Sequence, residues 1–283
     1  MHVLRRFAPA VMLTAVLLGG PVAAASAQPA DDDPDGGGHV VFVQGNDPAG
    51  NQVLVYQRAR DGSLTPVASY ATGGNGGRLN GAMADPLASQ GSLQFDPSHD
   101  LLIGVNAGSN TLYAFHVDGT RLADRQDLDS GGTFPVSVAV HQDLVYVLNA
   151  RGAGSVQGYR IDGAGRLHVI PGSTRSLDLV PNTTAMEFLT TPAQVGFTPD
   201  GGQLLVTTKN NASGSHIDVF QVHQDGRLSS SPVVNPSTTP VPFGFVFDAQ
   251  QQLVVGEAGT SSVSTYRVHD NGTLQPPAFP ADE

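Results

Sequence analysis

Few side chains in this sequence are suited to carry out chemistry. The chain of 283 residues contains no cysteine and a single lysine, Lys209, so thiol nucleophiles, disulfides and thiolate metal sites are excluded. Glu187 and Glu257 can serve as general bases, and the cations of Lys209, Arg78 and Arg151 can bind an anionic group. We therefore predict Glu257, Glu187 and Lys209 as the candidate catalytic residues.

Asparagine recurs at equivalent places in the loops that follow buried strands. One interpretation is a ring of polar groups that binds a hydroxylated or carboxylated ligand, with Lys209 or Asn210 and Glu257 at the equivalent places of the later loops. The other is that asparagine supports tight turns, because its side chain bonds nearby backbone and it tolerates left-handed backbone. The candidate ligand-binding residues are Asn46, Arg78, Asn106, Asn149, Arg151 and Asn210.

Metal and cofactor sites are not predicted. None of the nine histidines has a spacing typical of metal ligands, and we expect all of them to be solvated at the surface. The acidic run at residues 31–35 superficially matches a calcium loop, but the twelfth position, which needs a bidentate glutamate, is Phe42. We assign residues 28–38 to a flexible linker rich in aspartate and glycine.

Composition and charge exclude some classes of partner. The formal net charge is −11, from 14 lysines and arginines against 25 aspartates and glutamates. A polyanion would meet a repulsive field, so no nucleic-acid partner is expected. The hydrophobic fraction of 40% is enough for a packed core. A small-molecule ligand is the expected partner, and a protein partner is left open.

Residues 1–27 are typical of a secretory signal peptide. Two arginines precede an apolar stretch, residues 7–18, and small residues form a cleavage site that ends at Ala27. The apolar stretch is shorter than the ~20 residues that span a bilayer, which disfavours a membrane anchor. We predict that the chain is exported, either secreted or periplasmic, and that it has no membrane contact after cleavage behind Ala27.

From residue 39 onward the sequence repeats one unit five times. Each copy has a strand of β-branched and aromatic residues, then Asp-Gly or a related pair, then a leucine seven or eight residues after the aromatic. The copies recur about every 45 residues, with two longer insertions, residues 71–91 and 174–191, that are either functional loops or loosely ordered flaps. The repeated aromatics are Tyr56, Phe115, Tyr159, Phe220 and Tyr266.

Each unit predicts a four-stranded antiparallel sheet. A short apolar strand comes first, a second strand is apolar on both faces, the aromatic strand is third, and an Asp-Gly or Asn-Gly turn leads to a polar outer strand. Such units, repeating every ~40–50 residues, are typical of a β-propeller. We predict an all-β propeller domain over residues 39–283, whose first unit has only three strands, at residues 39–46, 51–58 and 63–71.

A family resemblance is carried by residues 197–207 (FTPDGGQLLVT) and 217–220 (IDVF). They resemble the seven-bladed β-propeller lactonases, a family that includes 6-phosphogluconolactonase and muconate-cyclising enzymes, and the resemblance covers nearly all of residues 39–279. It implies ring opening or closing of lactones, with no metal or cofactor. It also implies a seven-bladed ring, of which this chain would lack about two C-terminal blades, either as an open propeller or as an incomplete copy.

The catalytic pattern of that family is replaced in this chain. The family has Pro-Arg-His on an inner strand and a glutamate at the end of the next strand. The matching inner strand here reads Pro-Ala-Gln over residues 192–194, and the glutamate position holds Lys209. Lactone hydrolysis needs a general base and a positive group for the developing oxyanion, and neither transfers by position. Two hypotheses stay open: an exported lactonase-like enzyme acting on a small oxygenated compound, and a non-catalytic propeller that binds a ligand or a partner protein through its loop face.

Overall fold

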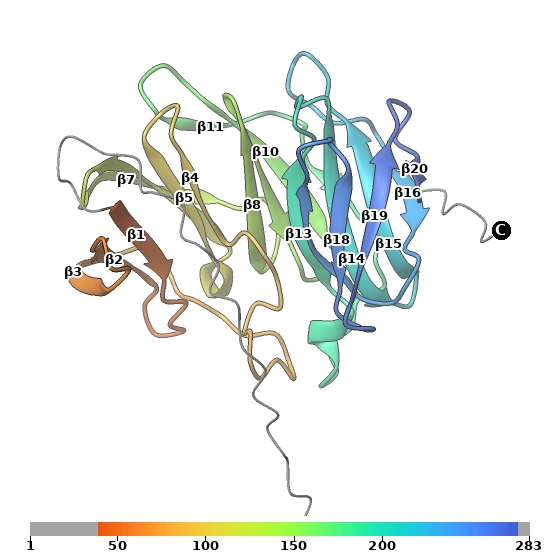
Figure 1. The fold of residues 1–283 in the computed structure, drawn as a ribbon, viewed down its shortest axis with the longest axis horizontal. Helices are drawn as coiled ribbons and strands as arrows, with labels where there is room; N and C mark the ends of the chain where they lie inside the picture. Colours follow the sequence, from red (N-terminus) through yellow and green to blue (C-terminus); the bar gives the residue numbers. More distant parts are fainter. Residues whose placement is uncertain (1–38, 277–283) are drawn as a thin grey trace, which may run out of the picture. The chain divides into compact units, whose positions relative to one another are not determined.

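The computed structural model describes residues 39–276, which form twenty β-strands and two short 3-10 turns, η1 (Ala107–Ser109) and η2 (Glu187–Leu189) (Figure 1). The predicted signal peptide and linker lie outside the described residues. The strands are arranged in five antiparallel sheets, one for each repeated unit. Over residues 39–276 no helix has the length and apolar character needed to cross a membrane.

The first sheet has three strands, as predicted, and the other sheets have four or five. Sheet 1 consists of β1 (His39–Gln44), β2 (Gln52–Arg58) and β3 (Leu64–Ala71). The remaining sheets are listed by their strands in chain order. Sheet 2 is β4 (Leu93–Asp96), β5 (Leu101–Asn106), β6 (Thr111–Asp118) and β7 (Arg121–Asp129). Sheet 3 is β8 (Pro135–His141), β9 (Leu144–Asn149), β10 (Ser155–Ile161), β11 (Leu167–Val169) and β12 (Arg175–Ser176). Sheet 4 is β13 (Pro192–Phe197), β14 (Gln203–Asn211), β15 (Gly214–Gln221) and β16 (Val233–Pro236), and sheet 5 is β17 (Pro242–Phe247), β18 (Leu253–Glu257), β19 (Ser262–Val268) and β20 (Leu274–Gln275).

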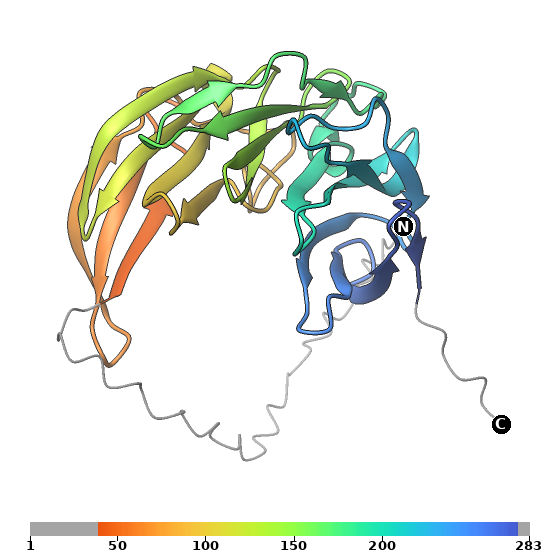
Figure 2. The same ribbon diagram turned by 90° about the horizontal axis from the view of Figure 1, so that it is seen from above.

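Within residues 39–276 the sheets stand side by side in chain order, with sheets 1 and 5 at the two ends of the row (Figure 2). The first strands of neighbouring sheets contact one another, β8 with β4 and β13, and β13 with β17. Strand β5 is buried along its whole length, because sheets pack on both of its faces. Four of the repeated aromatics, Phe115, Tyr159, Phe220 and Tyr266, are at most 4% exposed. This arrangement confirms the predicted all-β propeller architecture.

The expectation that every histidine is solvated is wrong for His216. This residue lies in β15 and is 5% exposed, and its Nε2 atom is 3.5 Å from Oδ2 of Asp218, which is 1% exposed. Residues two apart on a strand point to the same side of the sheet, which places the two side chains together. Burial by itself lowers the pKa of His216, but the Asp218 carboxylate and the Gly214 carbonyl more than offset burial and raise the pKa above its ordinary value.

Protonation of His216 is therefore linked to folding. A histidine whose pKa is raised in the folded state contributes stability that is complete below its unfolded pKa of 6.5 and is lost as the pH rises through the folded pKa. We expect the free energy of unfolding of the wild type to fall, relative to that of His216→Gln, as the pH rises above 6.5. Urea unfolding of both proteins between about pH 5 and about pH 9 measures this difference. A difference that stays constant over the range would contradict the linkage.

Candidate functional site

The end of the first insertion and the residue after it, residues 86–92, run along the inner strands, and we call this segment the strap. Gln90 N donates a hydrogen bond to Ala193 O on β13 at 3.0 Å. Gly91 O accepts a hydrogen bond from Val138 N on β8 at 2.8 Å. The strap therefore covers backbone groups on the free edges of two inner strands. This part of the insertion is packed into the fold and is not a loosely ordered flap.

Lys209, near the end of β14, holds the strap. Its Nζ atom donates to Ala88 O at 2.5 Å, and the side chain is 1% exposed. The Nζ atom also lies 5.5 Å from the centre of the Phe243 ring. Burial lowers the pKa of Lys209 to about 7, and the Asp85 carboxylate opposes this shift. The amine of this predicted catalytic residue is thus bound to the backbone of the protein itself.

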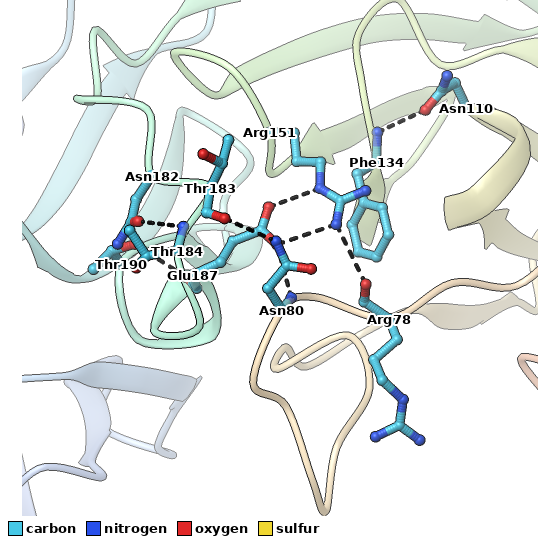
Figure 3. A network of polar contacts seen from close by, with 10 residues as sticks. All are labelled: Arg78, Asn80, Asn110, Phe134, Arg151, Asn182, Thr183, Thr184, Glu187 and Thr190. Atoms are coloured by element: carbon cyan, nitrogen blue, oxygen red, sulfur yellow. Dashed lines mark hydrogen bonds and ion pairs between the residues drawn. The ribbon is translucent and has the colours of Figure 1, made fainter.

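A second cluster joins the two insertions, and we call it the clamp: Arg78, Asn80, Arg151 and Glu187 (Figure 3). The Arg151 guanidinium donates twice to the Glu187 carboxylate, from Nε to Oε1 at 2.7 Å and from Nη2 to Oε2 at 3.1 Å. The backbone N–H of Asn80 donates to Glu187 Oε2 at 2.7 Å, and Arg151 Nη2 also donates to Arg78 O at 3.3 Å. The Arg151 guanidinium lies 4.2 Å from the centre of the Phe134 ring. The clamp thus ties the insertion before sheet 2 to the insertion before sheet 4.

The clamp limits the chemistry open to Glu187 and Arg78. Glu187 is 2% exposed. Burial by itself raises its pKa, but Arg151 and the Asn80 N–H hold the pKa below its ordinary value. Both carboxylate oxygens are bound, so Glu187 is poorly placed to accept a proton from a ligand. The Arg78 guanidinium points away from the network (Figure 3) and donates to Ala82 O at 2.5 Å.

Three of the four candidate asparagines hold backbone in place. Asn106 and Asn149 are fully buried, and their amides bond polar groups of neighbouring loops. Asn46, with a φ of 54°, exchanges two hydrogen bonds with the backbone of Gly77. The bonded partners lie 19 to 55 positions away along the chain, so these three asparagines tie separate loops together. The buried Oδ1 atom of Asn149 has no hydrogen-bond partner within residues 39–276, and Asn210 is the exposed member of the set.

A groove of about 650 Å³ lies beside β17 and β18, next to the strap. Gly244 and Gly256 leave part of its floor without side chains, and Val246 and Val263, which are 65% and 66% exposed, stand beside them. The glutamines of the groove come from the strap and from two inner strands. The polar lining residues are Gln90, Gln94, Gln194, Glu257, Ser261 and Ser262, and the larger apolar ones are Phe243, Phe245, Val246, Val254 and Val263.

Glu257 is the charged residue of the groove lining. It ends β18 and is 1% exposed, and its Oε1 atom accepts a hydrogen bond from Ser237 Oγ at 3.0 Å. Its Oε2 atom is buried and has no hydrogen-bond partner within residues 39–276. A buried carboxylate oxygen without a donor is unfavourable, so Glu257 is the candidate catalytic residue with a bonding position to fill. In the described part of the chain, no three histidine or acidic side chains are grouped so that they could hold a metal ion.

The glutamines were missed as site residues by sequence reasoning. Gln194 seals the free edge of β17, because its Nε2 donates to Phe245 O at 3.0 Å and its Oε1 accepts from Phe245 N at 2.8 Å. Gln90 is exposed and Gln94 is half-buried, and both line the groove. The sequence offered one sign of these site residues. Two expected inner strands carry a glutamine, Gln94 on β4 and Gln194 on β13, at positions where no turn requires this residue type.

The chain resembles one protein family in sequence and several solved structures in fold. The family model "Lactonase, 7-bladed beta-propeller" matches residues 49–280. A putative 6-phosphogluconolactonase from Bacteroides uniformis has a similar structure, with a TM-score of 0.63 and 17% identity over 84% of this chain and 67% of that chain. The periplasmic gluconolactonase of Pseudomonas aeruginosa has a TM-score of 0.61 and 16% identity over 83% of this chain and 65% of that chain. No curated protein matches the chain.

At such low identity these two structures support the fold. The chain spans about two thirds of the length of each of them. The family model, in contrast, covers most of the sequence, including all of sheets 2 to 5. Because this match extends over residues 49–280, the chain belongs to the family of seven-bladed β-propeller lactonases.

Proposed function

We propose that this protein is an exported, lactonase-like propeller that binds a small, uncharged lactone in the groove beside sheet 5. The observation that carries the proposal is the groove itself, which has a volume of about 650 Å³, valine walls, two phenylalanine rings and three glutamines. Ligand sites in proteins have volumes of about 300–1,000 Å³, mostly apolar walls and a few polar groups. Glutamine amides both donate and accept hydrogen bonds, which suits the carbonyl, ring oxygen and hydroxyl groups of a sugar lactone.

The charge of the groove favours an uncharged ligand. Among residues 39–276, no lysine, arginine or histidine lines it, and the charged residue of the lining is the acidic Glu257. The whole chain has a formal net charge of −11. A sugar phosphate would meet repulsion there without a cation to bind its phosphate group. Arg151, which was expected to bind anions, is paired with Glu187 in the clamp.

Two features support export. Residues 1–27 have the arginines, the apolar stretch and the small-residue cleavage site of a secretory signal. The Pseudomonas aeruginosa protein of similar fold is a periplasmic gluconolactonase. Gluconolactone carries no phosphate, so it matches the proposed ligand class and is the probe of choice.

Ring opening by Glu257 is a second candidate function, favoured by its place in the groove lining and by its Oε2 atom, which has no hydrogen-bond partner within residues 39–276. Because that atom is buried, the carboxylate must turn toward the groove to act. In this reaction Glu257 removes a proton from water, the resulting hydroxide attacks the lactone carbonyl, and the ring oxygen leaves and takes up a proton, so that the product is a hydroxy acid. A non-catalytic role is favoured by Gln194. It stands at the position of the family's histidine, and its amide is bound to the Phe245 backbone.

One set of titrations tests these functions. Calorimetry with the mature chain is expected to show gluconolactone binding at least about ten-fold more tightly than 6-phosphogluconolactone. If the ring is opened, Glu257→Gln is expected to lower turnover by about 100-fold or more in a pH-stat assay, while binding is kept because the side chain keeps its shape. If the wild type binds gluconolactone but does not hydrolyse it, the protein is a binding protein. A wild type that binds neither compound, or that prefers the phosphorylated one, overturns the proposal.

A further inference from the structure

The strap brings two residues of the groove lining, Gln90 and Gly91, to their places, and Gln90 is the one with a side chain. We propose that Lys209 is a positioning residue that latches the strap to sheet 4 and thereby fixes Gln90 in the lining of the groove. The part of this inference that concerns the ligand rests on the proposed function. The latch itself can be measured without a ligand.

The latch is a buried contact between β14 and the strap. Lys209 Nζ donates to Ala88 O at 2.5 Å, and the two residues are 1% and 5% exposed. Ala88 has a φ of 47°, in the left-handed region that residues with a side chain seldom adopt, and such a conformation persists where its surroundings hold it. Lys209 is fixed in turn, because its backbone N–H donates to Thr191 O at 3.3 Å.

Two residues after Ala88, the strap places Gln90 in the groove. Gln90 N donates to Ala193 O at 3.0 Å, which fixes its backbone on β13. The side chain passes close to Gly244, since a Cβ atom added to that glycine would lie 2.9 Å from Gln90 Cγ. A shift of the strap would therefore move the Gln90 side chain away from Gly244 and from the other groove residues.

Other bonds shape the strap and tie it to sheet 3. Asp85 accepts hydrogen bonds from Leu87 N at 3.1 Å and from Ser89 N at 2.9 Å. The Ser89 hydroxyl donates to Val136 O on β8 at 2.8 Å. Lys209 supplies the matching side-chain bond from sheet 4. Loss of its donor would thus release the strap on the side where Gln90 enters the groove.

A lysine is an unfavourable residue for this place unless its donor is needed. The ammonium group loses its hydration when it is buried, and burial lowers the pKa of Lys209 to about 7 in spite of Asp85. An apolar side chain of similar length would pack there without this penalty, but it would leave the Ala88 carbonyl without its donor. The position of the chain's single lysine is thus explained by the bond that holds the strap.

The latch is tested first without a ligand. Lys209→Met removes the donor and keeps the length of the side chain. We expect the amide hydrogens of residues 88–91 to exchange at least about ten-fold faster in this variant, while those of β9 and β10 exchange as in the wild type. Hydrogen–deuterium exchange with mass spectrometry measures both. Unchanged exchange in the strap overturns the latch.

A second measurement needs no variant and applies if Lys209→Met does not fold. Because Lys209 is the only lysine, an amine-acylating reagent can modify two amines, the Lys209 side chain and the N-terminus, and mass spectrometry of peptides separates them. Because acylation needs access to the amine, the native wild type is expected to keep Lys209 unmodified, and the urea-unfolded chain is expected to be modified rapidly. Equal modification of Lys209 in the native and unfolded chains overturns the latch.

The positioning role is tested by a double-mutant cycle with gluconolactone. We expect Lys209→Met and Gln90→Ala each to weaken binding about ten-fold, and the double variant to bind no more weakly than Gln90→Ala alone. A purely structural role of Lys209 would make the two losses add. Additive losses, or normal binding by Lys209→Met in spite of faster strap exchange, overturn the positioning role. If the wild type binds no gluconolactone, the proposed function fails, and the exchange result still decides the latch.

Discussion

Replacing Arg151 by leucine is expected to lower the free energy of unfolding by about 3 kcal/mol. The Glu187 carboxylate, 2% exposed, would keep the Asn80 N–H as a donor but lose the two bonds from the guanidinium. A buried charge without its partner is among the most destabilising changes a single substitution can make. Loss of the contact with the Phe134 ring adds to the effect. Urea unfolding followed by circular dichroism measures the change.

The double variant with leucine at both Arg151 and Glu187 is the matched control. It removes both charges, so no buried charge remains unpaired, and we expect it to regain more than half of the lost stability. The single variant is also expected to speed the exchange of the Asn80 amide, because the two insertions are joined there. A single variant as stable as the wild type, or a double variant less stable than the single one, would contradict the role assigned to the clamp.

The sheets could be predicted from the sequence because their signals are local. A third strand with its aromatic, such as the one that holds Phe220, is followed at a fixed distance by an Asp-Gly turn and a leucine, and the turn favours a hairpin. The same spacing recurs at Tyr266. Such a unit cannot bury both faces of its strands alone, so repetition implies sheets packed side by side. The three strands of sheet 1 were predicted for the same reason.

The strap and the clamp could not be predicted, because the contacts that form them join distant residues. Lys209 and Ala88 are separated by 121 positions, and Asn80 and Glu187 by 107. Both insertions lack the alternating pattern of a strand and the periodic pattern of a helix. The sequence therefore does not show which residues of the insertions contact which strands. Functional loops and loose flaps were therefore equally good interpretations.

One candidate residue lies in the proposed site. Glu257 was named because a carboxylate can serve as a general base; it lines the groove, and its catalytic role stays a prediction. Gln90 and Gln94 were missed, because a glutamine carries no charge and fits almost any surface. The burial of His216 was missed because a histidine near the start of a strand is usually exposed. Its spacing from Asp218 was the available sign, since residues two apart on a strand share a face.

Filling the groove is expected to abolish ligand binding. Val254 lies on β18, paired with Val246 on β17, and lines the groove. Its neighbours Leu253 and Val255 are fully buried in the core, and they point to the opposite face of the sheet. Phenylalanine in place of Val254 would therefore occupy the groove without overpacking the core. We expect it to weaken the binding of gluconolactone by about 100-fold or more.

Val234→Phe is the matched control, because Val234 lies on β16, is 57% exposed and does not line the groove. The most direct test of the proposed site is calorimetric titration of gluconolactone into the wild type, Val254→Phe and Val234→Phe. Saturable binding by the wild type and by Val234→Phe, with none measurable for Val254→Phe, is the predicted result. Equal binding by all three proteins would contradict the assignment of the groove as the ligand site.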